Sequence, residues 1–227
     1  MTLPSFLQPG TKTYDIICAS PVIAWYSFSL YSQLQFVGDE FTNVEPSKMD
    51  MSWAMSICSH GAILLFATLL IYLLLRRHPP ISGTGGFFPR FAALAGTYLS
   101  TAMITLPQMP ALSLWVQVGT LLTLMGTAFA VYALISLGRS VSIMAEARAL
   151  VTSGPYRIVR HPLYLGEQIA LVGLMLQFFS YWAVALLAFQ FTFQFYRMRY
   201  EERLLKHTFP EYKSYAARTY RLIPLIY

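Results

Sequence analysis

Charged residues are scarce in this chain of 227 residues, of which only 11% are Asp, Glu, Lys or Arg. A soluble domain usually has about 25%, and one globular core cannot bury the 56% of residues that are hydrophobic. The composition therefore favours a bilayer as the surrounding medium. The formal net charge of +6 does not predict nucleic-acid binding, because the basic residues lie between apolar runs, where they can face anionic lipid headgroups.

Cysteine and metal-ligating patterns are also rare. The two cysteines, Cys18 and Cys58, both fall within apolar segments, which indicates neither a disulfide framework nor a metal site. The four histidines are scattered, and no pair of them has the spacing of metal ligands. We therefore expect no bound metal.

Two further signatures are missing. The N-terminus has no basic region followed by a short apolar core and a small-residue cleavage site, so we expect no cleaved signal peptide. The fingerprint G-x-G-x-x-G does not occur either, which argues against a dinucleotide-binding domain of the soluble type.

Long apolar runs are abundant. A membrane-spanning helix needs about 20 mainly apolar residues, and the sequence offers six such segments. They are residues 16–37, 53–75, 88–107, 111–137, 162–179 and 181–198. The sequence thus predicts an all-α fold, a polytopic integral membrane helix bundle with about six transmembrane helices. The last two segments are separated only by the region around Ser180 and form a predicted helical hairpin.

Charge placement predicts the topology. Cytoplasmic loops collect Lys and Arg, and the basic residues concentrate in segments 76–90 and 138–160 and in the tail from 197. The loop between the first two spans is acidic instead. Six spans with both termini in the cytoplasm place every basic stretch on one side. Residues 1–137 would then hold four spans, and residues 138–227 a hairpin with a cytosolic tail.

The polar stretch "GPYRIVRHPLYLGE" (154–167) interrupts this apolar chain. Pro162 suits the first position of a helix, which makes His161 the expected N-cap. A helix N-terminus favours an anion, and Arg160 would strengthen that preference. Tyr156 and Tyr164 add aromatic faces suited to a flat ring or a cation. The stretch therefore predicts an anion-binding cradle beside aromatic walls.

Arginine and tyrosine at a membrane interface also occur simply as anchors. That interpretation explains His161 and Glu167 poorly. Glu167 would lie more than one turn inside a membrane helix, where ionisable residues are costly and usually functional, although it could merely neutralise a neighbouring arginine. The small residues Gly166, Ala170 and Gly173 of the same segment could mark close helix packing.

A second polar region follows the hairpin. Arg197 and Glu201 lie four residues apart, as do Glu202 and Lys206. Acid before base stabilises a helix better than the reverse order, so Glu202–Lys206 is typical of helix support. Arg197–Glu201 is a better candidate for ligand contact, although an ordinary salt bridge remains an alternative.

The order of these motifs resembles the isoprenylcysteine carboxyl methyltransferase family, part of a wider membrane methyltransferase group that includes phospholipid N-methyltransferases. The resemblance rests on "LVTSGPYRIVRHPLYLG" (150–166), the apolar hairpin, "EE" (201–202) and "FPEYKSYAARTYRLIP" (209–224). It covers roughly residues 136–224, so residues 138–227 are identified as the catalytic region.

The resemblance implies S-adenosylmethionine as methyl donor, in a cytosolic pocket formed by the C-terminal half and capped by the C-terminal segment. Arg197 corresponds to the arginine that approaches a reacting carboxylate. The implied cofactor positions are Arg148, Ala149, Leu150, Val151, Tyr156, His161, Pro162, Leu163, Tyr164 and Glu201. The chain departs from the eukaryotic isoprenylcysteine enzymes at Arg148, where a histidine is usual, and in its shorter membrane region.

The methyl acceptor is expected to be a lipophilic molecule resident in the membrane, and membrane lipids are the other expected partners. Arg197 favours a carboxylate of the isoprenylcysteine type, because its guanidinium could orient the carboxylate through two hydrogen bonds. A carboxylate nucleophile also needs no base. A phospholipid amine is the alternative, for which acidic groups near the methyl would be preferred.

Two other function classes compete. Sterol and steroid reductases carry a similar Arg-His-Pro-x-Tyr box and use NADPH, although their variable position is usually Asn, whereas Leu163 stands here. A non-catalytic transporter or scaffold is the third class. It should show polar groups or broken helices near mid-bilayer, often in both halves of the chain, whereas the ionisable groups here gather at one face of the second half.

Overall fold

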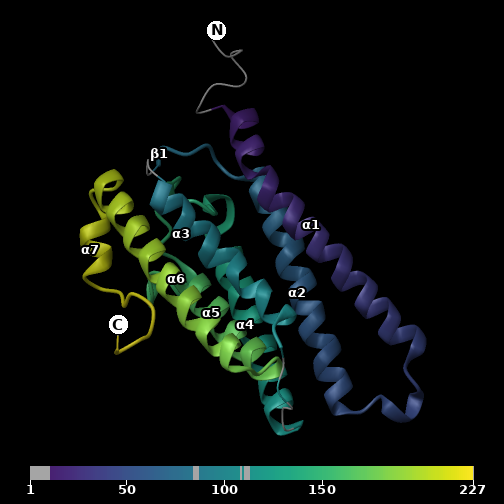
Figure 1. Cartoon of the computed structure of the whole chain (residues 1–227). Helices are drawn as coiled ribbons and strands as arrows, with labels where there is room; N and C mark the ends of the chain where they lie inside the picture. Colours follow the sequence, from purple (N-terminus) through teal and green to yellow (C-terminus); the bar gives the residue numbers. More distant parts are fainter. Residues whose placement is uncertain (1–10, 84–86, 108, 110–112, 227) are drawn as a thin grey trace.

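The computed structural model describes residues 11–83, 87–107, 109 and 113–226. The chain is mostly helical, as expected (Figure 1). The main helices are α1 (Lys12–Asn43), α2 (Met51–Arg76), α3 (Phe87–Tyr98), α4 (Ser113–Leu137), α5 (Pro162–Gln177), α6 (Tyr181–Thr208) and α7 (Tyr212–Ala216). Short 3-10 turns occupy Pro46–Lys48, Leu99–Thr105, Gly138–Ser140 and Gly154–Arg157. A two-residue antiparallel pair, β1 (Ser82–Gly83) with β2 (Glu146–Ala147), was not expected from the sequence.

Local sequence explains where several helices begin. The side chain of Asp50 accepts a hydrogen bond from the Trp53 amide at the start of α2, and Ser180 caps α6 through the Ala183 amide. Such caps satisfy backbone N–H groups that the helix itself leaves without partners. Helix α5 begins at Pro162 with His161 as its N-cap residue, as the sequence predicts, although the imidazole makes no capping hydrogen bond.

The long helices pack in a definite order. Helices α1 and α2 lie side by side as an antiparallel pair on one flank (Figure 1), and α2 contacts α4, α4 contacts α5, and α3 contacts α6. An apolar cluster lies where the first two helices meet α4. Its buried members are Val22, Leu70, Leu73, Leu74, Leu134, Val141 and Ile143.

Glycine allows α4 and α5 to approach closely. A Cβ atom added at Gly126 would lie 2.4 Å from the Ala170 amide nitrogen, and one at Gly173 would lie 2.4 Å from the Gly119 carbonyl oxygen. Both distances are shorter than any side chain permits, so the two backbones are in direct contact. This confirms that Gly166 and Gly173 mark close packing, as small residues do between membrane helices.

The three basic segments meet at one end of the bundle. Arg139 donates to the Arg76 carbonyl oxygen at 2.8 Å, and β1 joins the segment after α2 to the segment after α4. The hydroxyl groups of Ser82 and Thr208 lie 2.6 Å apart, which adds the end of α6 to the same region. One end of the molecule therefore gathers the positive charge that the topology prediction assigns to the cytoplasmic side.

Two helical segments are long and apolar enough, by length and composition, to cross a membrane: Met51–Arg76 and Ser113–Ser140. Helices also occupy the other four ranges in which we predict spans, but six transmembrane helices remain a prediction. Large apolar side chains such as Phe28, Leu65, Ile135 and Phe189 are more than half exposed on the helix surfaces. Such a surface indicates membrane association. The N-terminal residues 1–10, which we place in the cytoplasm, lie outside the described residues.

Candidate functional site

A tight turn brings the polar stretch 154–167 back onto the bundle. Gly154 has φ +58°, and a Cβ atom there would lie 2.6 Å from the Ser136 hydroxyl oxygen of α4. Only glycine combines this left-handed conformation with so close an approach. The turn that follows buries Pro155 and Tyr156 against the bundle, and the chain then enters α5 at Pro162.

A pocket lies beside the start of α5, and the structure gathers nine of the ten predicted cofactor residues around it. These are Arg148, Ala149, Leu150, Val151, Tyr156, His161, Leu163, Tyr164 and Glu201. The tenth, Pro162, is fully buried at the first position of α5 and does not line the pocket. The pocket lining thus comes from the end of α4, the segment between α4 and α5, the first turn of α5, the C-terminal part of α6, and α7.

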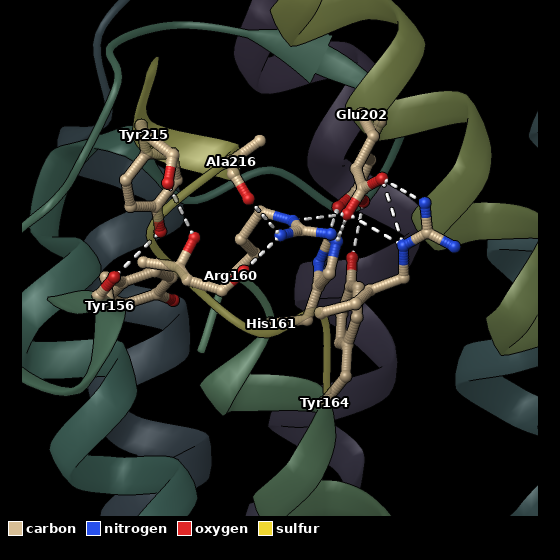
Figure 2. A network of polar contacts seen from close by, with 10 residues as sticks. Tyr156, Arg160, His161, Tyr164, Glu202, Tyr215 and Ala216 are labelled. Atoms are coloured by element: carbon tan, nitrogen blue, oxygen red, sulfur yellow. Dashed lines mark hydrogen bonds and ion pairs between the residues drawn. The ribbon is translucent and has the colours of Figure 1, made fainter. Parts of the chain in front are cut away.

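Glu202 stands at the centre of a polar network next to this pocket (Figure 2). Its carboxylate accepts from Arg160 Nε at 2.8 Å and from Arg221 Nη2 at 2.6 Å, and it lies 3.3 Å from His161 Nε2. The prediction that Glu202 supports its helix through Lys206 is therefore wrong. Residue spacing along one helix could not show that Arg160, 42 positions earlier, and Arg221, 19 positions later, would bind this carboxylate.

The network adds to what the sequence predicts for the anion cradle. Arg160 lines the pocket and pairs with Glu202, and its guanidinium also donates to the carbonyl oxygens of Ala216 and Thr219. The same carboxylate pairs with Arg221, so the two arginines together carry one more positive charge than Glu202 neutralises. An anion-binding cradle at the start of α5 stays a prediction.

Electrostatics fix the charge of Glu202. Burial opposes ionisation of this carboxyl, but hydrogen bonds from His161, Arg221 and Arg160 outweigh that effect and hold its pKa well below the usual range. Glu202 is thus an anion at neutral pH, and its role is to bind the cations around it.

The C-terminal segment closes over the same region. Backbone hydrogen bonds join the Arg160 amide to the Tyr220 carbonyl oxygen at 2.8 Å and the Tyr220 amide to the Ile158 carbonyl oxygen at 3.0 Å. The Tyr215 hydroxyl donates to the Tyr156 carbonyl oxygen at 2.8 Å (Figure 2). Tyr212 and Tyr215 also line the pocket. Burial raises the pKa of Tyr215 to about 12, so its hydroxyl remains a donor at physiological pH.

Arg197 lies directly behind the pocket wall. Its Nε is 3.3 Å from a Glu201 carboxylate oxygen, and its guanidinium carbon is 4.8 Å from the centre of the Tyr164 ring. The Tyr164 hydroxyl in turn donates to Glu201. The Arg197–Glu201 contact has ion-pair distance without hydrogen-bond geometry, so we treat it as electrostatic only.

Sequence reasoning missed two acidic residues here: Glu146, which lines the pocket, and Asp15, which contacts the pocket residue Arg148. This carboxylate of α1 is 4% exposed and accepts from Arg77 Nε at 2.8 Å and from Arg148 Nη2 at 2.8 Å. Arg148 donates further to Glu146 at 2.6 Å and to the His78 carbonyl oxygen. Asp15 is one acidic residue before an apolar run, and nothing in the sequence pairs it with an arginine 133 positions later.

Comparisons with known proteins identify the segment that carries this site. The phospholipid methyltransferase family model matches residues 114–212. The resemblance to the membrane methyltransferases is confirmed. The matched segment includes α4, the pocket segment, the α5–α6 hairpin and the beginning of α7.

Curated relatives match a smaller part of the chain. The nickel-cobalt-cadmium resistance protein NccN of Alcaligenes xylosoxydans xylosoxydans is 39% identical over 80 residues, which is 35% of this chain. The cobalt-zinc-cadmium resistance protein CzcN of Cupriavidus metallidurans is 41% identical over 76 residues, or 33% of this chain. The matches span 38% and 35% of the length of these relatives. Among the described residues, no group of three or more His, Cys, Asp or Glu side chains is placed to hold a metal ion.

The side chains of this pocket suit the methyl donor that methyltransferases generally use. Arg148 offers a guanidinium whose buried Nε has no hydrogen-bond partner among the described residues, and Glu201 offers a carboxylate. Tyr156 and Tyr164 are buried aromatic rings, and Leu150 and Leu163 are apolar. S-adenosylmethionine has a carboxylate, an amino group, ribose hydroxyls and an adenine ring, so the donor set fits.

Proposed function

We propose that this protein is an integral, multi-pass membrane methyltransferase that uses S-adenosylmethionine to methylate a lipophilic acceptor. One observation carries the proposal: nine of the ten residues that resemble the family's cofactor positions surround a single pocket, with Arg197 at its back wall. The pocket is at the end of the bundle where the basic segments meet. We therefore propose that the active site and both termini face the cytoplasm.

Within this proposal Arg148 holds the donor's carboxylate, and Glu201 holds its amino or hydroxyl groups. Tyr156 and the neighbouring leucines contact the adenine ring. When bound, the donor supplies a methyl group already activated by its sulfonium charge, so the protein needs mainly to align the reactants and exclude water. The C-terminal segment, held by Tyr215 and by the Glu202 network, covers the pocket and excludes water from it.

The acceptor's reacting group is proposed to lie beside Arg197. The carboxylate of an isoprenylcysteine-type lipid is one candidate, because arginine can orient a carboxylate through two hydrogen bonds. It would have to draw Arg197 away from Glu201, Thr97 and the Ser142 carbonyl oxygen. A phospholipid amine is the second candidate, and the position of Glu167 near Arg197, described below, favours it.

Replacement of Arg197 tests its role in either case. We expect Arg197→Ala to abolish methyl transfer while affinity for S-adenosylhomocysteine is retained, since Glu201 is still bound by the Tyr164 hydroxyl. Radiolabelled methyl transfer and calorimetric titration would measure the two quantities. A parallel loss of both would show that Arg197 only supports the pocket.

Calorimetric titration of the detergent-purified protein with S-adenosylhomocysteine, and separately with NADPH, tests the proposed function. We expect saturable S-adenosylhomocysteine binding that His161→Ala removes and that His207→Ala, an exposed histidine on α6, leaves unchanged. Thermal melting of both variants would verify that they are folded. Binding of NADPH in place of S-adenosylhomocysteine would assign the Arg-His-Pro box to the reductase class and overturn the proposal.

A further inference from the structure

A second cavity lies inside the helix bundle, on the other side of Arg197 from the cofactor pocket. Residues of all six long helices line it, most of them apolar. The lining residues are Tyr26, Ile63, Phe66, Gly96, Thr97, Thr127, Ala130, Glu167, Ala170, Leu171 and Gln190. Glu167 is the one acidic residue in that lining.

A ladder of polar side chains leads from this cavity between α5 and α6. Gln194 donates to Glu167 at 3.1 Å, Gln168 donates to Gln190 at 3.0 Å, and Gln190 donates to the Gly96 carbonyl oxygen at 2.9 Å. Gln190 and Gln194 are 1% and 0% exposed. Polar groups buried between apolar helices are costly unless they are hydrogen-bonded. The ladder satisfies most of them, but Gln194 Oε1 has no hydrogen-bond partner among the described residues, which leaves a buried acceptor for a ligand.

Arg197 connects the two cavities. Its Nη1 donates to the Thr97 hydroxyl at 3.2 Å, and Thr97 lines the second cavity. On its other side the guanidinium meets Tyr164 and Glu201, which line the cofactor pocket. Glu167 follows Tyr164 by three residues, which is about 4.5 Å along a helix axis. A group in the second cavity would therefore lie within a short distance of a methyl group held in the first.

We propose that the second cavity receives the reacting group of the acceptor, and that Glu167 is the catalytic residue that takes the proton from its attacking atom. The inference rests on the proposed methyltransferase function and deepens it. It assigns the acceptor to lipophilic molecules whose nucleophile bears a proton, such as an amine, thiol or hydroxyl group.

The charges in this region favour such an acceptor over a carboxylate. Two carboxylates already interact with the cation Arg197. Glu201 is paired with it, and Glu167, held by Gln194 one turn before Arg197 on α6, interacts with it electrostatically. A third carboxylate would be repelled in a medium of low dielectric. A protic nucleophile adds no negative charge, and Glu167 can accept a hydrogen bond from it.

The step balances with the groups named. The attacking atom forms a bond to the methyl carbon, and the carbon–sulfur bond of the donor breaks with its electron pair remaining on sulfur. The sulfonium becomes a neutral thioether, and the proton of the attacking atom passes to the Glu167 carboxylate. No metal, oxidant or additional reactant is required.

Carbodiimide labelling tests the inference without depending on turnover. Dicyclohexylcarbodiimide is apolar and modifies carboxyl groups that can be protonated in apolar surroundings. We expect it to label Glu167 in the full chain, as located by peptide mass mapping, and to leave the exposed Glu211 unlabelled. Glu167→Gln should remove the adduct, whereas Glu211→Gln should not. An unlabelled Glu167 would overturn the proposal.

Protection by matched probes then identifies the acceptor chemistry. Dodecylamine should slow labelling by about tenfold when it saturates the cavity, since occupied protein cannot react, and dodecanoate should not. Protection by dodecanoate, or by neither probe, would overturn the assignment.

We also expect Glu167→Gln to lower methyl transfer to dodecylamine by at least about 100-fold, the usual effect of a general base, with unchanged S-adenosylhomocysteine affinity. If the wild-type protein failed to bind S-adenosylhomocysteine, the methyltransferase proposal would fail independently of the labelling result.

Discussion

Glu201 and Glu202 are adjacent, yet the structure gives them different surroundings. Glu201 lines the pocket beside the start of α5 and contacts Arg197 and Tyr164. Glu202 instead binds Arg160 and Arg221. Successive side chains along a helix differ in direction by about 100°, which is enough to separate a carboxylate that lines the pocket from one that holds the C-terminal segment.

Removal of each charge should therefore affect different quantities. We expect Glu201→Gln to weaken S-adenosylhomocysteine binding far more than Glu202→Gln. Glu202→Gln should lower stability by about 2–3 kcal/mol, because it leaves charged donors without their acceptor. Calorimetric titration and thermal melting of the two variants in the same detergent would measure both effects. Equal losses of binding affinity would remove the distinction.

The depressed pKa of Glu202 also predicts an acid-side effect. The Glu202 network stabilises the folded state fully above the ordinary glutamate pKa of about 4.3, and that contribution is lost as the pH falls below this value toward the lowered pKa. The melting temperature of the wild-type protein should fall over this range more steeply than that of Glu202→Gln. Parallel pH profiles would show that other groups control acid unfolding.

Asp15 is expected to position Arg148 from a distant part of the chain. Asp15→Asn would leave the buried guanidinium groups of Arg77 and Arg148 facing each other without their shared carboxylate. Loss of one partner from a buried ion pair costs about 3–5 kcal/mol, and we also expect weaker S-adenosylhomocysteine binding. The double variant Asp15→Asn/Arg77→Gln removes one unpaired charge and should recover part of the stability. No recovery would exclude charge imbalance as the cause.

Among the elements, the contact between α4 and α5 depends most directly on single residues. Gly119 and Gly126 of α4 meet Gly173 and Gly166 of α5, and a Cβ atom at any of these positions would meet backbone atoms within 2.8 Å. Backbone cannot move aside as the end of a side chain can. The position of the α5–α6 hairpin, which carries Tyr164 and Glu167, therefore depends on these four glycines.

Alanine substitution tests this contact. We expect Gly126→Ala to destabilise the protein by about 1–3 kcal/mol or more through overpacking. Gly61→Ala in α2 is the matched control, since a Cβ atom there meets nothing within 4 Å. The control should be neutral or slightly stabilising, because alanine favours a helix by up to about 1 kcal/mol over glycine. Similar melting temperatures for both variants would contradict the proposed contact.

For the whole molecule, closure of the site joins residues far apart in sequence. The C-terminal segment contacts the stretch before α5 through Tyr215 and Tyr220, and α1 contacts the pocket residue Arg148 through Asp15. Both ends of the described chain thus help to position residues of the pocket lining. Changes in either end are expected to affect ligand binding.

Alkaline pH tests the closure by the C-terminal segment. Since the pKa of Tyr215 is raised to about 12, the stability it contributes is complete below the ordinary tyrosine pKa of about 10 and is lost as the pH rises toward 12. Tyr215→Phe should reduce this alkaline loss and lower stability near neutral pH by about 1 kcal/mol, the net value of one hydrogen bond. Melting temperatures between pH 8 and pH 12 would measure the effect. An unchanged profile would show that Tyr215 does not control closure.

Local rules explain what could be predicted from the sequence. Apolar length placed helices in all six expected ranges, proline placed the start of α5 at residue 162, and the motif order identified the residues that gather around the pocket. These features depend on neighbouring residues or on a resemblance that extends over residues 136–224. Such information is contained in the order of amino acids alone.

The partners of the charged side chains depended on the tertiary structure. The pairing of Glu202 with Arg160 and Arg221, of Asp15 with Arg148, and of Glu167 with Gln194 each joins residues separated by 19 to 133 positions. A charged side chain can pair with any oppositely charged or hydrogen-bonding residue, however far away that residue is in the sequence. Only helix packing, fixed by contacts such as those of Gly126 and Gly166, decides which partner comes within reach.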